Sequence, residues 1–561
     1  MVDFRKQVEK ALEKHVKKAV LTEPPDPSMG DYAFPCFELA KQQGKKPGEV
    51  AEDLARTIQL GDHIREVKVS GPFLNFFVNK EKLSEDVLRR IFKEKKDYGR
   101  RKPGEKNILV EYFQANTHKG VHIGHIRNIC LGEALCRLLE ADGQKVTRLN
   151  YQGDIGPHVA KCLWGYLNLH KGEEPDYKKG IWLGRVYAEA SEKAAEDENV
   201  EQEIREMTKK LYQGDKQLMS IWKKTRNWCL DDFDDLYDEI KVHFDRIFFE
   251  SEVEEPGRKI VEKMLEQGLA KKDQGAVVID LEKEDLGVFL LLRNDGVALY
   301  STKDLGLQHL KLQEFGKPDA SFHVVGSEQS LYFRQLFKTF EKIKCPLAGI
   351  SEHISYGLVM LPEGKMSSRE GTMVLYEELV SKLRQEAMRG VEERHTGWKQ
   401  QDKRKSAENI AFGALKFTMV NRENNKNITF DWEKALSFEG ESGPYVQYAH
   451  ARICSILRKY GSDVEDEVDF RLLRHSKEHE LVALMARFRD TVSEAAKGRK
   501  PHAIARYALD LAQLFSEFYR DCQVISDDKD LTKARILLAE CTRQVIENCL
   551  NLLNIEASER M

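Results

Sequence analysis

The sequence lacks any long hydrophobic run. No stretch of about 18 consecutive apolar residues occurs in its 561 residues, so a transmembrane helix is not expected. The first residues, MVDFRKQVEKALEKHV, carry charges throughout and contain no apolar core of a signal peptide. These absences predict a protein that makes no contact with a membrane.

Paired cysteines are also absent. The ten cysteines are scattered and form no Cys-x-x-Cys pair, which argues against a disulfide framework and against a zinc site. A reducing, cytoplasmic location fits this pattern, and no metal ligands are predicted. Neither charge sign dominates, because 89 Lys and Arg against 93 Asp and Glu leave a formal net charge of −4. Any nucleic acid must therefore bind local basic faces rather than a global positive field.

The chain is too long for one hydrophobic core, and about two to four domains are expected. Its hydrophobic fraction of 41% and charged fraction of 32% are typical of a globular protein. Residues 1–100 predict a small α+β domain, because a helical stripe begins at Phe4 and two β-prone runs fill 68–79. The basic segment 93–106 is the predicted boundary.

Residues 101–375 alternate β-prone runs with helical patterns, and a long, charged helical insertion covers about 160–243. This alternation predicts an α/β domain with a parallel, doubly wound sheet, whose ligands bind at the carboxyl ends of the strands. The predicted strands are 107–113, 146–151, 246–251, 276–281, 288–293, 321–326 and 354–360. Strand signals disappear in 376–561, which predicts an all-α C-terminal domain.

The segment 107–142 predicts a strand, a polar loop and a helix that begins near His122. His122 and His125, three residues apart, would lie on one side of the first helical turn. Backbone N–H groups and the helix dipole favour phosphate there. Gly124 removes a side chain between the histidines, so a flat ring could approach the backbone. The alternative is that the histidines merely cap the helix or lie exposed.

A second candidate motif is Leu361–Thr372, which follows an apolar strand. Lys365, Ser367, Ser368 and Arg369 stand between two glycines in this segment. Such a cationic, hydroxyl-bearing loop could close over a polyphosphate. The alternative is a solvated surface loop.

The two motifs, HIGH at 122–125 and KMSS at 365–368, resemble the paired signatures of class I aminoacyl-tRNA synthetases. The likeness narrows to the arginyl-tRNA synthetases and covers nearly the whole chain. Six further segments carry it: EYFQANTHK (111–119), NYQGDIG (150–156), YSTKD (300–304), VGSEQ (325–329), GPYVQYAHAR (443–452) and LLNIEASERM (552–561).

The resemblance implies an arginine–tRNA ligase. Such an enzyme activates L-arginine with ATP to arginyl-adenylate and transfers arginine to the 3′-terminal adenosine of tRNA(Arg). A Rossmann-type catalytic domain is then expected at 101–375, an N-terminal tRNA-contacting domain at 1–100 and an anticodon-binding domain at 376–561. Mg²⁺ would accompany ATP, activation would require bound tRNA, and the chain is expected to be a monomer.

The same resemblance assigns two groups of substrate-binding residues. The ATP group is His122, Gly124, His125, Lys365 and Ser367. The arginine group is Glu111, Tyr300 and Asp304 at the guanidinium end, and Asn116, His122 and Gln329 at the amino-acid head group. Carboxylates suit a planar guanidinium. The alternative for Asp304 is a charge that complements a helix N-terminus, whereas Glu111 in a buried strand needs a partner in any case.

One departure from the family pattern concerns charge. Ser368 stands where the family usually has a second lysine, and Lys119 lies just before His122. We predict that Lys119 supplies the missing positive charge, so that the catalytic set is Lys119, His122, His125 and Lys365. Gln114 and Ala115 also replace the more usual small polar residue and proline.

Contacts with tRNA are predicted in two places. In the C-terminal domain the candidates combine aromatic, polar and basic groups that suit splayed bases: Tyr445, Gln447, Tyr448, His450 and Arg452. In the N-terminal domain they are Asn75 and Phe77. The alternative in both places is packing, within a core helix or a strand.

Two other function classes remain open on the sequence alone. A nucleotidyltransferase that does not use tRNA can also carry a HxGH motif, although the KMSS spacing and the helical C-terminal domain argue against it. An inactive, RNA-binding paralogue is the other, and intact His122, His125, Lys365 and Asp304 argue against that.

Overall fold

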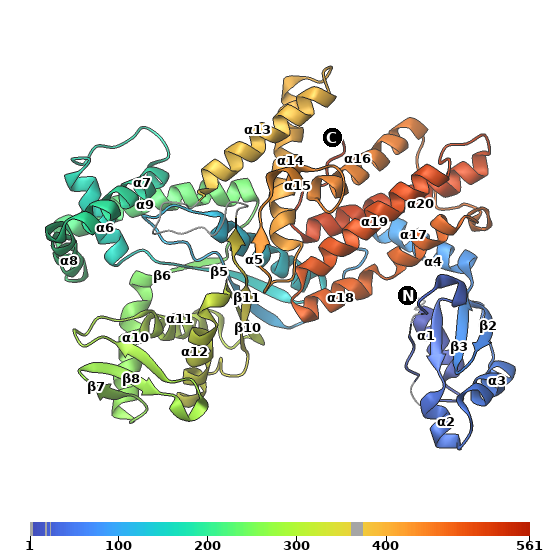
Figure 1. The fold of residues 1–561 in the computed structure, drawn as a ribbon, viewed down its shortest axis with the longest axis horizontal. Helices are drawn as coiled ribbons and strands as arrows, with labels where there is room; N and C mark the ends of the chain where they lie inside the picture. The colour runs from blue at the N-terminus through green and yellow to red at the C-terminus, as the bar shows by residue number, and fades with distance from the viewer. Residues whose placement is uncertain (1–3, 17–18, 23, 361–373) are drawn as a thin grey trace.

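The computed structural model describes residues 4–16, 19–22, 24–360 and 374–561. An α/β region and a helical C-terminal region lie side by side along the long axis of the molecule, and a small N-terminal domain lies below the far end of the helical region (Figure 1). None of the helices in these ranges is both long and apolar enough to span a bilayer. The second motif, including Lys365, Ser367 and Ser368, lies outside the described residues.

The N-terminal domain is a three-stranded antiparallel sheet covered by helices. Its strands, β1 (Tyr32–Pro35), β2 (Ile64–Ser70) and β3 (Phe73–Val78), lie in the order β1-β3-β2. The helices are α1 (Phe4–Leu12), η1 (Pro27–Met29), α2 (Phe37–Gln43) and α3 (Pro47–Thr57). Alternate residues such as Leu74 and Phe76 bury one face against α1 and α3. The predicted α+β domain is confirmed.

The linker to the catalytic region is helical. α4 (Lys80–Glu94) and η2 (Lys95–Asp97) pack against the C-terminal helices rather than on the N-terminal sheet. The hydroxyl of Tyr98 donates to Met485 O at 2.8 Å, and Asn548 Nδ2 donates to Tyr98 O at 3.1 Å. The basic segment 93–106 is therefore anchored to the helical region.

The catalytic sheet has five parallel strands in the order β11-β10-β4-β5-β6. They are β4 (Asn107–Glu111), β5 (Lys145–Gln152), β6 (Arg246–Phe249), β10 (Ala320–Gly326) and β11 (Ser351–Tyr356). The chain moves outward from β4 through β5 to β6 and then resumes on the other side of β4 at β10. A doubly wound sheet opens a crevice at such a reversal, at the carboxyl ends of its central strands. The predicted fold class is confirmed.

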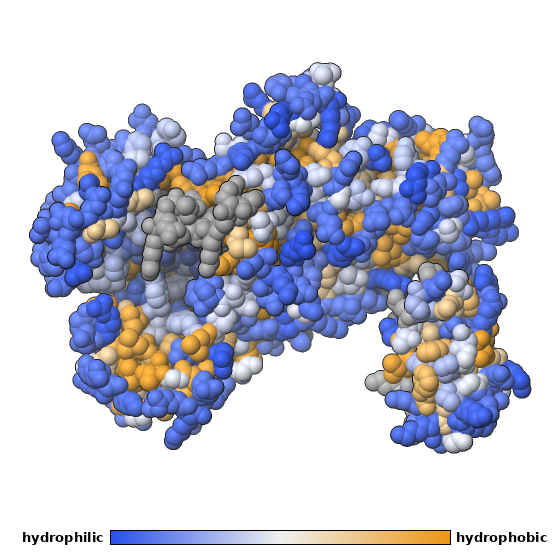
Figure 2. All heavy atoms as spheres, in the orientation of Figure 1, coloured by the Kyte–Doolittle hydropathy of each residue, from blue (hydrophilic) through white to orange (hydrophobic). Residues whose placement is uncertain are grey.

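Two of the predicted strands do not belong to this sheet. The strands at 276–281 and 288–293 form, with β7 (Lys271–Asp273), a separate antiparallel sheet as β8 (Ala276–Asp280) and β9 (Val288–Leu292). The connection between them holds only η3 (Glu282–Glu284), whereas parallel neighbours need a crossover of a dozen or more residues. Strand β9 exposes Val288 and Leu290, and Figure 2 shows a hydrophobic patch in this part of the molecule, surrounded by hydrophilic side chains.

The helices of the catalytic region cover the sheet and form the insertion. α5 (Ile123–Ala141) follows β4, and α10 (Glu250–Glu266), α11 (Tyr300–Phe315), η4 (Ser327–Gln329) and α12 (Ser330–Lys342) surround the antiparallel module. The predicted helical insertion is α6 (Pro157–Asn168), α7 (Lys179–Glu196), α8 (Glu198–Tyr212) and α9 (Lys216–Ile240). The insertion has an apolar core of its own around Leu163 and Trp222.

The C-terminal region is helical, with one short exception. Its helices are α13 (Tyr376–Arg394), α14 (Gln400–Val420), α15 (Trp432–Leu436), α16 (Gly443–Tyr460), η5 (Phe470–Leu472), α17 (Ser476–Ala486), α18 (Phe488–Gly498), α19 (Pro501–Asp521) and α20 (Lys529–Leu552). The exception is β13 (Ile428–Thr429), which pairs in parallel with β12 (Val359–Met360). This pairing joins the helical region to the strand that precedes the second motif.

A buried guanidinium holds that junction together. Arg127 lies in the second turn of α5 and is 1% exposed. Its two terminal nitrogens donate to four backbone oxygens, those of Gly357, Leu358, Asn424 and Lys426, at 2.5–3.2 Å. Burial lowers the pKa of Arg127 to about 10, and the four acceptors that it contacts in the described part of the chain are backbone carbonyls rather than carboxylates. The helix that starts at His122 is thus fastened to the two segments that lead into β12 and β13.

Replacing this guanidinium tests its structural role. Arg127→Met removes the donors and leaves buried carbonyl oxygens without partners, which is among the more destabilising changes known in protein cores. We expect the midpoint of thermal unfolding to fall by at least about 5 °C. Arg506→Met is the matched control, because Arg506 makes only exposed ion pairs with Glu441 and Asp510. A midpoint that falls equally in both variants would contradict the role given to Arg127.

Candidate active site

The candidate site lies where the order of the parallel strands reverses. β4 and β10 are neighbours, with His323 paired to Glu111, and α5 begins after the loop that follows β4. His122 is the N-cap residue of α5. The predicted strand, loop and helix start are therefore confirmed. The HIGH segment, residues 122–125, faces the crevice that this topology creates.

The two histidines of the HIGH segment are neutral, and their geometry fixes which nitrogen carries the proton. Nδ1 of His122 accepts from Gly124 N at 3.1 Å, and Nδ1 of His125 accepts from His122 N at 3.2 Å. Burial, followed by the nearby Lys119 charge, lowers the pKa of His122 to about 4, and burial lowers that of His125 well below its usual value. With Nδ1 used as an acceptor, each neutral ring carries its proton on Nε2. The pair therefore offers two N–H donors.

Gly124 is required by this arrangement. A Cβ at that position would lie 2.9 Å from Cε1 and 3.0 Å from Nδ1 of His122. The His122 ring folds back over the glycine in order to cap the helix. The sequence predicted a glycine here to leave room for a flat ligand ring. The structure adds a second reason, because any side chain at this position would clash with the His122 ring.

The loop between β4 and α5 adopts unusual backbone conformations. Phe113, Gln114 and His118 have φ values of 81°, 48° and 61°, which non-glycine residues rarely adopt. Asn128 Oδ1 accepts from Phe113 N at 2.6 Å, and Asn150 Oδ1 accepts from Gln114 N at 3.2 Å. Such strain persists only where surrounding contacts enforce it, and it concentrates at functional sites.

The helical insertion supports the next part of this loop. Nε2 of His118 lies 2.8 Å from Thr225 Oγ1 on α9. A Cβ at Gly184 on α7 would lie 2.8 Å from the Gly120 nitrogen, so the two backbones are in direct contact. Between these two points, the Lys119 ammonium lies 5.0 Å from the centre of the Tyr187 ring on α7. A cation–π contact of this kind orients the ammonium.

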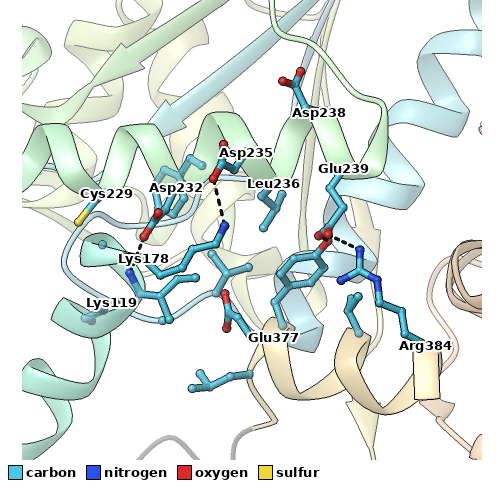
Figure 3. Close-up of a pocket in the computed structure, with 18 residues that line it drawn as sticks. Lys119, Lys178, Cys229, Asp232, Asp235, Leu236, Asp238, Glu239, Glu377 and Arg384 are labelled. Carbon is cyan, nitrogen blue, oxygen red and sulfur yellow. Dashed lines mark hydrogen bonds and ion pairs between the residues drawn. The ribbon is translucent and has the colours of Figure 1, made fainter. Parts of the chain in front are cut away.

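Lys119 also borders a cavity of about 370 Å³ between α7, α9 and the start of α13. Figure 3 shows this cavity lined by acidic side chains of α9, with Lys178 bonded to Asp235 and Arg384 bonded to Glu239. Figure 3 shows no ion pair between Lys119 and the acidic side chains drawn there.

Asp304 lies at the start of the second turn of α11, near Glu111 at the end of β4. Its Oδ2 accepts a hydrogen bond from the Tyr332 hydroxyl of α12. Burial, assisted by the negative charge of Glu111, raises the pKa of Asp304 to about 7. Tyr300, one helical turn earlier, is 64% exposed. Tyr300 and Asp304 thus lie one helical turn apart, and Asp304 lies within electrostatic reach of Glu111.

Glu111 has the partner that its burial requires. Lys311 Nζ lies 2.5 Å from Oε2, and Gln114 Nε2 donates to Oε1 at 3.1 Å. Burial alone would raise the pKa of Glu111, but Lys311 and His323 hold it well below its usual range. One oxygen, Oε1, therefore keeps a lone pair for a further donor.

The two remaining head-group candidates lie at the rim of the same crevice. A Cβ at Gly153 would lie 2.2 Å from Asn116 Oδ1, so the asparagine side chain rests on the glycine that follows β5. Gln329 is exposed at the end of η4, directly after β10.

Several residues of this site were not predicted from the sequence. Tyr332 and His323 come from distant segments, and no local pattern connects them to Asp304 or Glu111. Lys311 had a usable signal, because it follows Asp304 by seven residues, which is two helical turns, and so lies on the same helix face. The buried Lys303–Glu250 pair, at 2.7 Å, also went unpredicted.

The predicted tRNA contacts of the C-terminal region divide into two sets. Gln447 and His450 are 0% and 2% exposed. Gln447 Nε2 donates to Glu556 O at 2.8 Å, and His450 Nδ1 lies 2.9 Å from Ser558 O. These two side chains bind the C-terminal segment of the chain instead of facing solvent, which corrects the prediction that they face RNA.

Tyr448 and Arg452 lie on the outer face of the same helix, α16. The Arg452 guanidinium lies 4.8 Å from the Tyr448 ring centre and 5.5 Å from that of Tyr519 on α19. Tyr445 is half-buried beside them. Tyr519, which is 41% exposed, extends the predicted aromatic and basic set and could be found only from the tertiary structure.

Asn75 and Phe77 are the predicted contacts of the N-terminal domain. Both lie on β3 and are 5% and 9% exposed. The Phe77 ring faces the Lys68 ammonium at 4.7 Å and the Arg65 guanidinium at 5.7 Å. The structure therefore corrects both assignments towards strand packing, with basic side chains on the outer surface.

Comparison with protein families identifies the fold as a known one. The model for "tRNA synthetases class I (R), catalytic domain" matches residues 87–432. The chain belongs to the arginyl-tRNA synthetase family. The arginyl-tRNA synthetase N-terminal domain model matches residues 2–78, and the DALR anticodon binding domain model matches 446–561.

Individual relatives agree over the full length. The arginine–tRNA ligase of Clostridioides difficile (strain 630) is 34% identical, with 100% of both chains covered. That of Bdellovibrio bacteriovorus is 36% identical over 98% of this chain and 95% of its own. The structure of the Thermus thermophilus arginyl-tRNA synthetase has a TM-score of 0.83 at 28% identity, with 100% of each chain covered. The predicted family, class I fold and ligase class are confirmed.

The unusual state of Asp304 can be tested by stability. In the unfolded chain a carboxyl group ionises near its usual pKa, whereas in the folded protein Asp304 ionises only near pH 7. Folding stability therefore falls as pH rises between these values, and the cost is complete above pH 7. Asp304→Asn keeps an acceptor for Tyr332 but removes the buried charge.

We expect Asp304→Asn to raise the midpoint of thermal unfolding, with a gain at least about 2 °C larger at pH 8 than at pH 5. Asp510→Asn, which removes an exposed carboxylate, serves as the control and should show no such growth with pH. A gain that is independent of pH would contradict the raised pKa of Asp304.

Proposed function

We propose that the chain activates L-arginine with ATP and transfers the arginyl group to the 3′-terminal adenosine of tRNA(Arg), and that activation requires bound tRNA. The observation that carries this proposal is the pairing of two features in one crevice. Two neutral histidines offer Nε2–H donors at a helix N-terminus, and the buried carboxyl of Asp304 lies near the carboxyl end of β4. The first suits phosphate and the second suits a guanidinium.

In the first step an arginine carboxylate oxygen attacks the α-phosphorus of ATP. The new bond is an oxygen–phosphorus bond, and the bond to pyrophosphate breaks with its electron pair leaving on the pyrophosphate. The step consists mostly of positioning and charge stabilisation. His122 and His125 donate from Nε2 to phosphate oxygens, and Gly124 leaves space for the adenine ring. Lys119 stabilises the charge that develops on the leaving pyrophosphate.

Lys365 and Ser367 are proposed to close on the same pyrophosphate. Mg²⁺ is proposed to enter with ATP, held largely by phosphate oxygens. In the described part of the chain no three His, Cys, Asp or Glu side chains converge on a metal-binding geometry. We further propose a cytoplasmic monomer, in which the ten cysteines are free thiols.

Arginine is selected through its guanidinium. Asp304 provides a carboxylate once the bound cation has displaced its proton, and Oε1 of Glu111 accepts one further N–H. Tyr300 covers the group from the exposed start of α11. Asn116, Gln329 and His122 hold the amino-acid head group. A neutral pocket that becomes anionic on binding disfavours neutral amino acids, because each buried acceptor would then lack a donor.

In the second step a ribose hydroxyl of the terminal adenosine attacks the arginyl carbonyl, and AMP leaves. The C-terminal region is proposed to bind the anticodon loop through Tyr445, Tyr448 and Arg452, where stacking and charge act together. Domains at 1–100, 101–375 and 376–561 are proposed for tRNA contact, catalysis and anticodon binding respectively.

The overall function is tested by ATP–pyrophosphate exchange. With arginine and ATP we expect exchange when tRNA(Arg) is present and none when it is omitted or replaced by a tRNA for another amino acid. Exchange without tRNA would contradict the dependence on tRNA. Exchange with lysine in place of arginine would contradict the specificity, and no exchange under any of these conditions would contradict the activity itself.

The role of Lys119 is tested by substitution. Lys119→Ala removes a charge that acts in the transition state, so we expect the exchange rate to fall by at least about 100-fold. Lys119→Arg should retain part of the activity. Lys178→Ala, a change in the same cavity, is the matched control, because Lys178 pairs with Asp235 at 3.0 Å, and its rate should change by less than about twofold. Near-normal exchange by Lys119→Ala would refute the assignment.

A further inference from the structure

One buried hydroxyl near the proposed arginine site has no partner. Tyr151 is the seventh residue of β5, and its Oη is buried without a hydrogen bond to any described residue. Other buried tyrosines of this region are satisfied. The Tyr112 hydroxyl donates to Glu133, that of Tyr237 accepts from Asn150 and Gln152, and that of Tyr332 donates to Asp304. An unsatisfied buried hydroxyl is costly, and proteins keep few of them.

The sheet register places this hydroxyl at the guanidinium end of the site. Glu111 pairs with Leu149, so Tyr151 lies two residues further towards the carboxyl end on the same face of the sheet. That face is covered by α11, because Leu149 packs with Leu307 in one apolar cluster. Asp304 stands one turn before Leu307 on this helix. Tyr151 Oη therefore extends beyond the apolar layer to the level of the two carboxyl groups.

Electrostatics agree with this placement. Burial raises the pKa of Tyr151 well above its usual value, and the further contributions come, in decreasing order, from Glu250, Asp304, Tyr332 and Glu111. The hydroxyl thus lies among carboxyl groups that it does not bond in this structure. A ligand that brings several N–H donors would satisfy it.

The number of acceptors supports the same conclusion. A guanidinium presents five N–H groups. Asp304 has one oxygen occupied by Tyr332, and Glu111 is engaged by Lys311 and Gln114. His323 Nδ1 also lies 3.7 Å from Oε2 of Glu111, so the two carboxyl groups keep about four free acceptor positions for five donors. A phenol hydroxyl can accept an N–H while it donates its own proton to a neighbouring carboxylate.

We propose that Tyr151 is a further specificity-determining residue, whose hydroxyl accepts a guanidinium N–H of arginine beside Asp304. This inference rests on the proposed function, because it assumes that arginine occupies the site. Its oxygen needs no reorganisation to bind, since no internal hydrogen bond has to be broken first.

The test is Tyr151→Phe in the full-length chain, assayed by pyrophosphate exchange with tRNA(Arg) present. Loss of a hydrogen bond to a charged group should raise the KM for arginine by about tenfold. The KM for ATP and kcat should change by less than about twofold, because the hydroxyl acts on binding alone. Agmatine, which carries the guanidinium without the carboxylate, should lose inhibitory affinity by the same factor as arginine. The unfolding midpoint should not fall, since no native hydrogen bond is lost.

Tyr166→Phe is the matched control, because the Tyr166 hydroxyl of the insertion donates to Gly172 O at 2.9 Å. We expect it to lower the unfolding midpoint and to leave the KM for arginine unchanged. An unchanged arginine KM in Tyr151→Phe would overturn the proposal whether stability rises, stays or falls. Absence of arginine-dependent exchange by the unmodified chain is a different result, since it would refute the proposed function before Tyr151 is reached.

Discussion

The guanidinium of Arg127 is the interaction on which the arrangement of the site depends. It lies in the second turn of the helix that His122 caps, and it donates to backbone oxygens of the two segments that lead into β12 and β13. All of the acceptors that it contacts within the described ranges are neutral backbone carbonyls. Carbonyl oxygens at 357–358 and 424–426 are thereby drawn to a single point. The HIGH segment (122–125) and the strand that leads to the second motif are consequently held in fixed relative positions, although they are far apart in the sequence.

Around this anchor, burial keeps most of the candidate binding groups uncharged. His122 and His125 are neutral, and Asp304 ionises only near pH 7. The exceptions are compensated, as Glu111 is by Lys311 and Glu250 by Lys303. A site of this kind avoids the desolvation cost of isolated buried charges. Each charge can then appear when a substrate of opposite sign displaces or attracts a proton.

The sequence predicted the parts of this molecule that local patterns determine. The strand, loop and helix at 107–142 follow from apolar periodicity and a capping residue, and the strand reversal follows from alternating strands and helices. The assignment of 276–281 and 288–293 to the parallel sheet was wrong because it rested on the alternation of strands and helices alone. It did not take into account that their connection is too short for a parallel crossover. Gln447 and His450 share a helix with Tyr448, and only tertiary packing decides which face of that helix is covered. Tyr332 and Tyr187 act on distant residues, and no spacing in one sequence reveals such contacts.

The direct contact between Gly184 of α7 and Gly120 gives the helical insertion a mechanical character. At most interfaces, side chains can change rotamer and so accommodate small displacements of the backbone. The two glycines have no side chains that could adjust, so a shift of α7 would act directly on the backbone of the loop. The insertion is therefore better regarded as a structural support of the loop that carries Lys119 than as a separate appendage. A trimmed catalytic core without residues 160–243 would keep every motif residue of the chain and still lack the surface that aligns one of them.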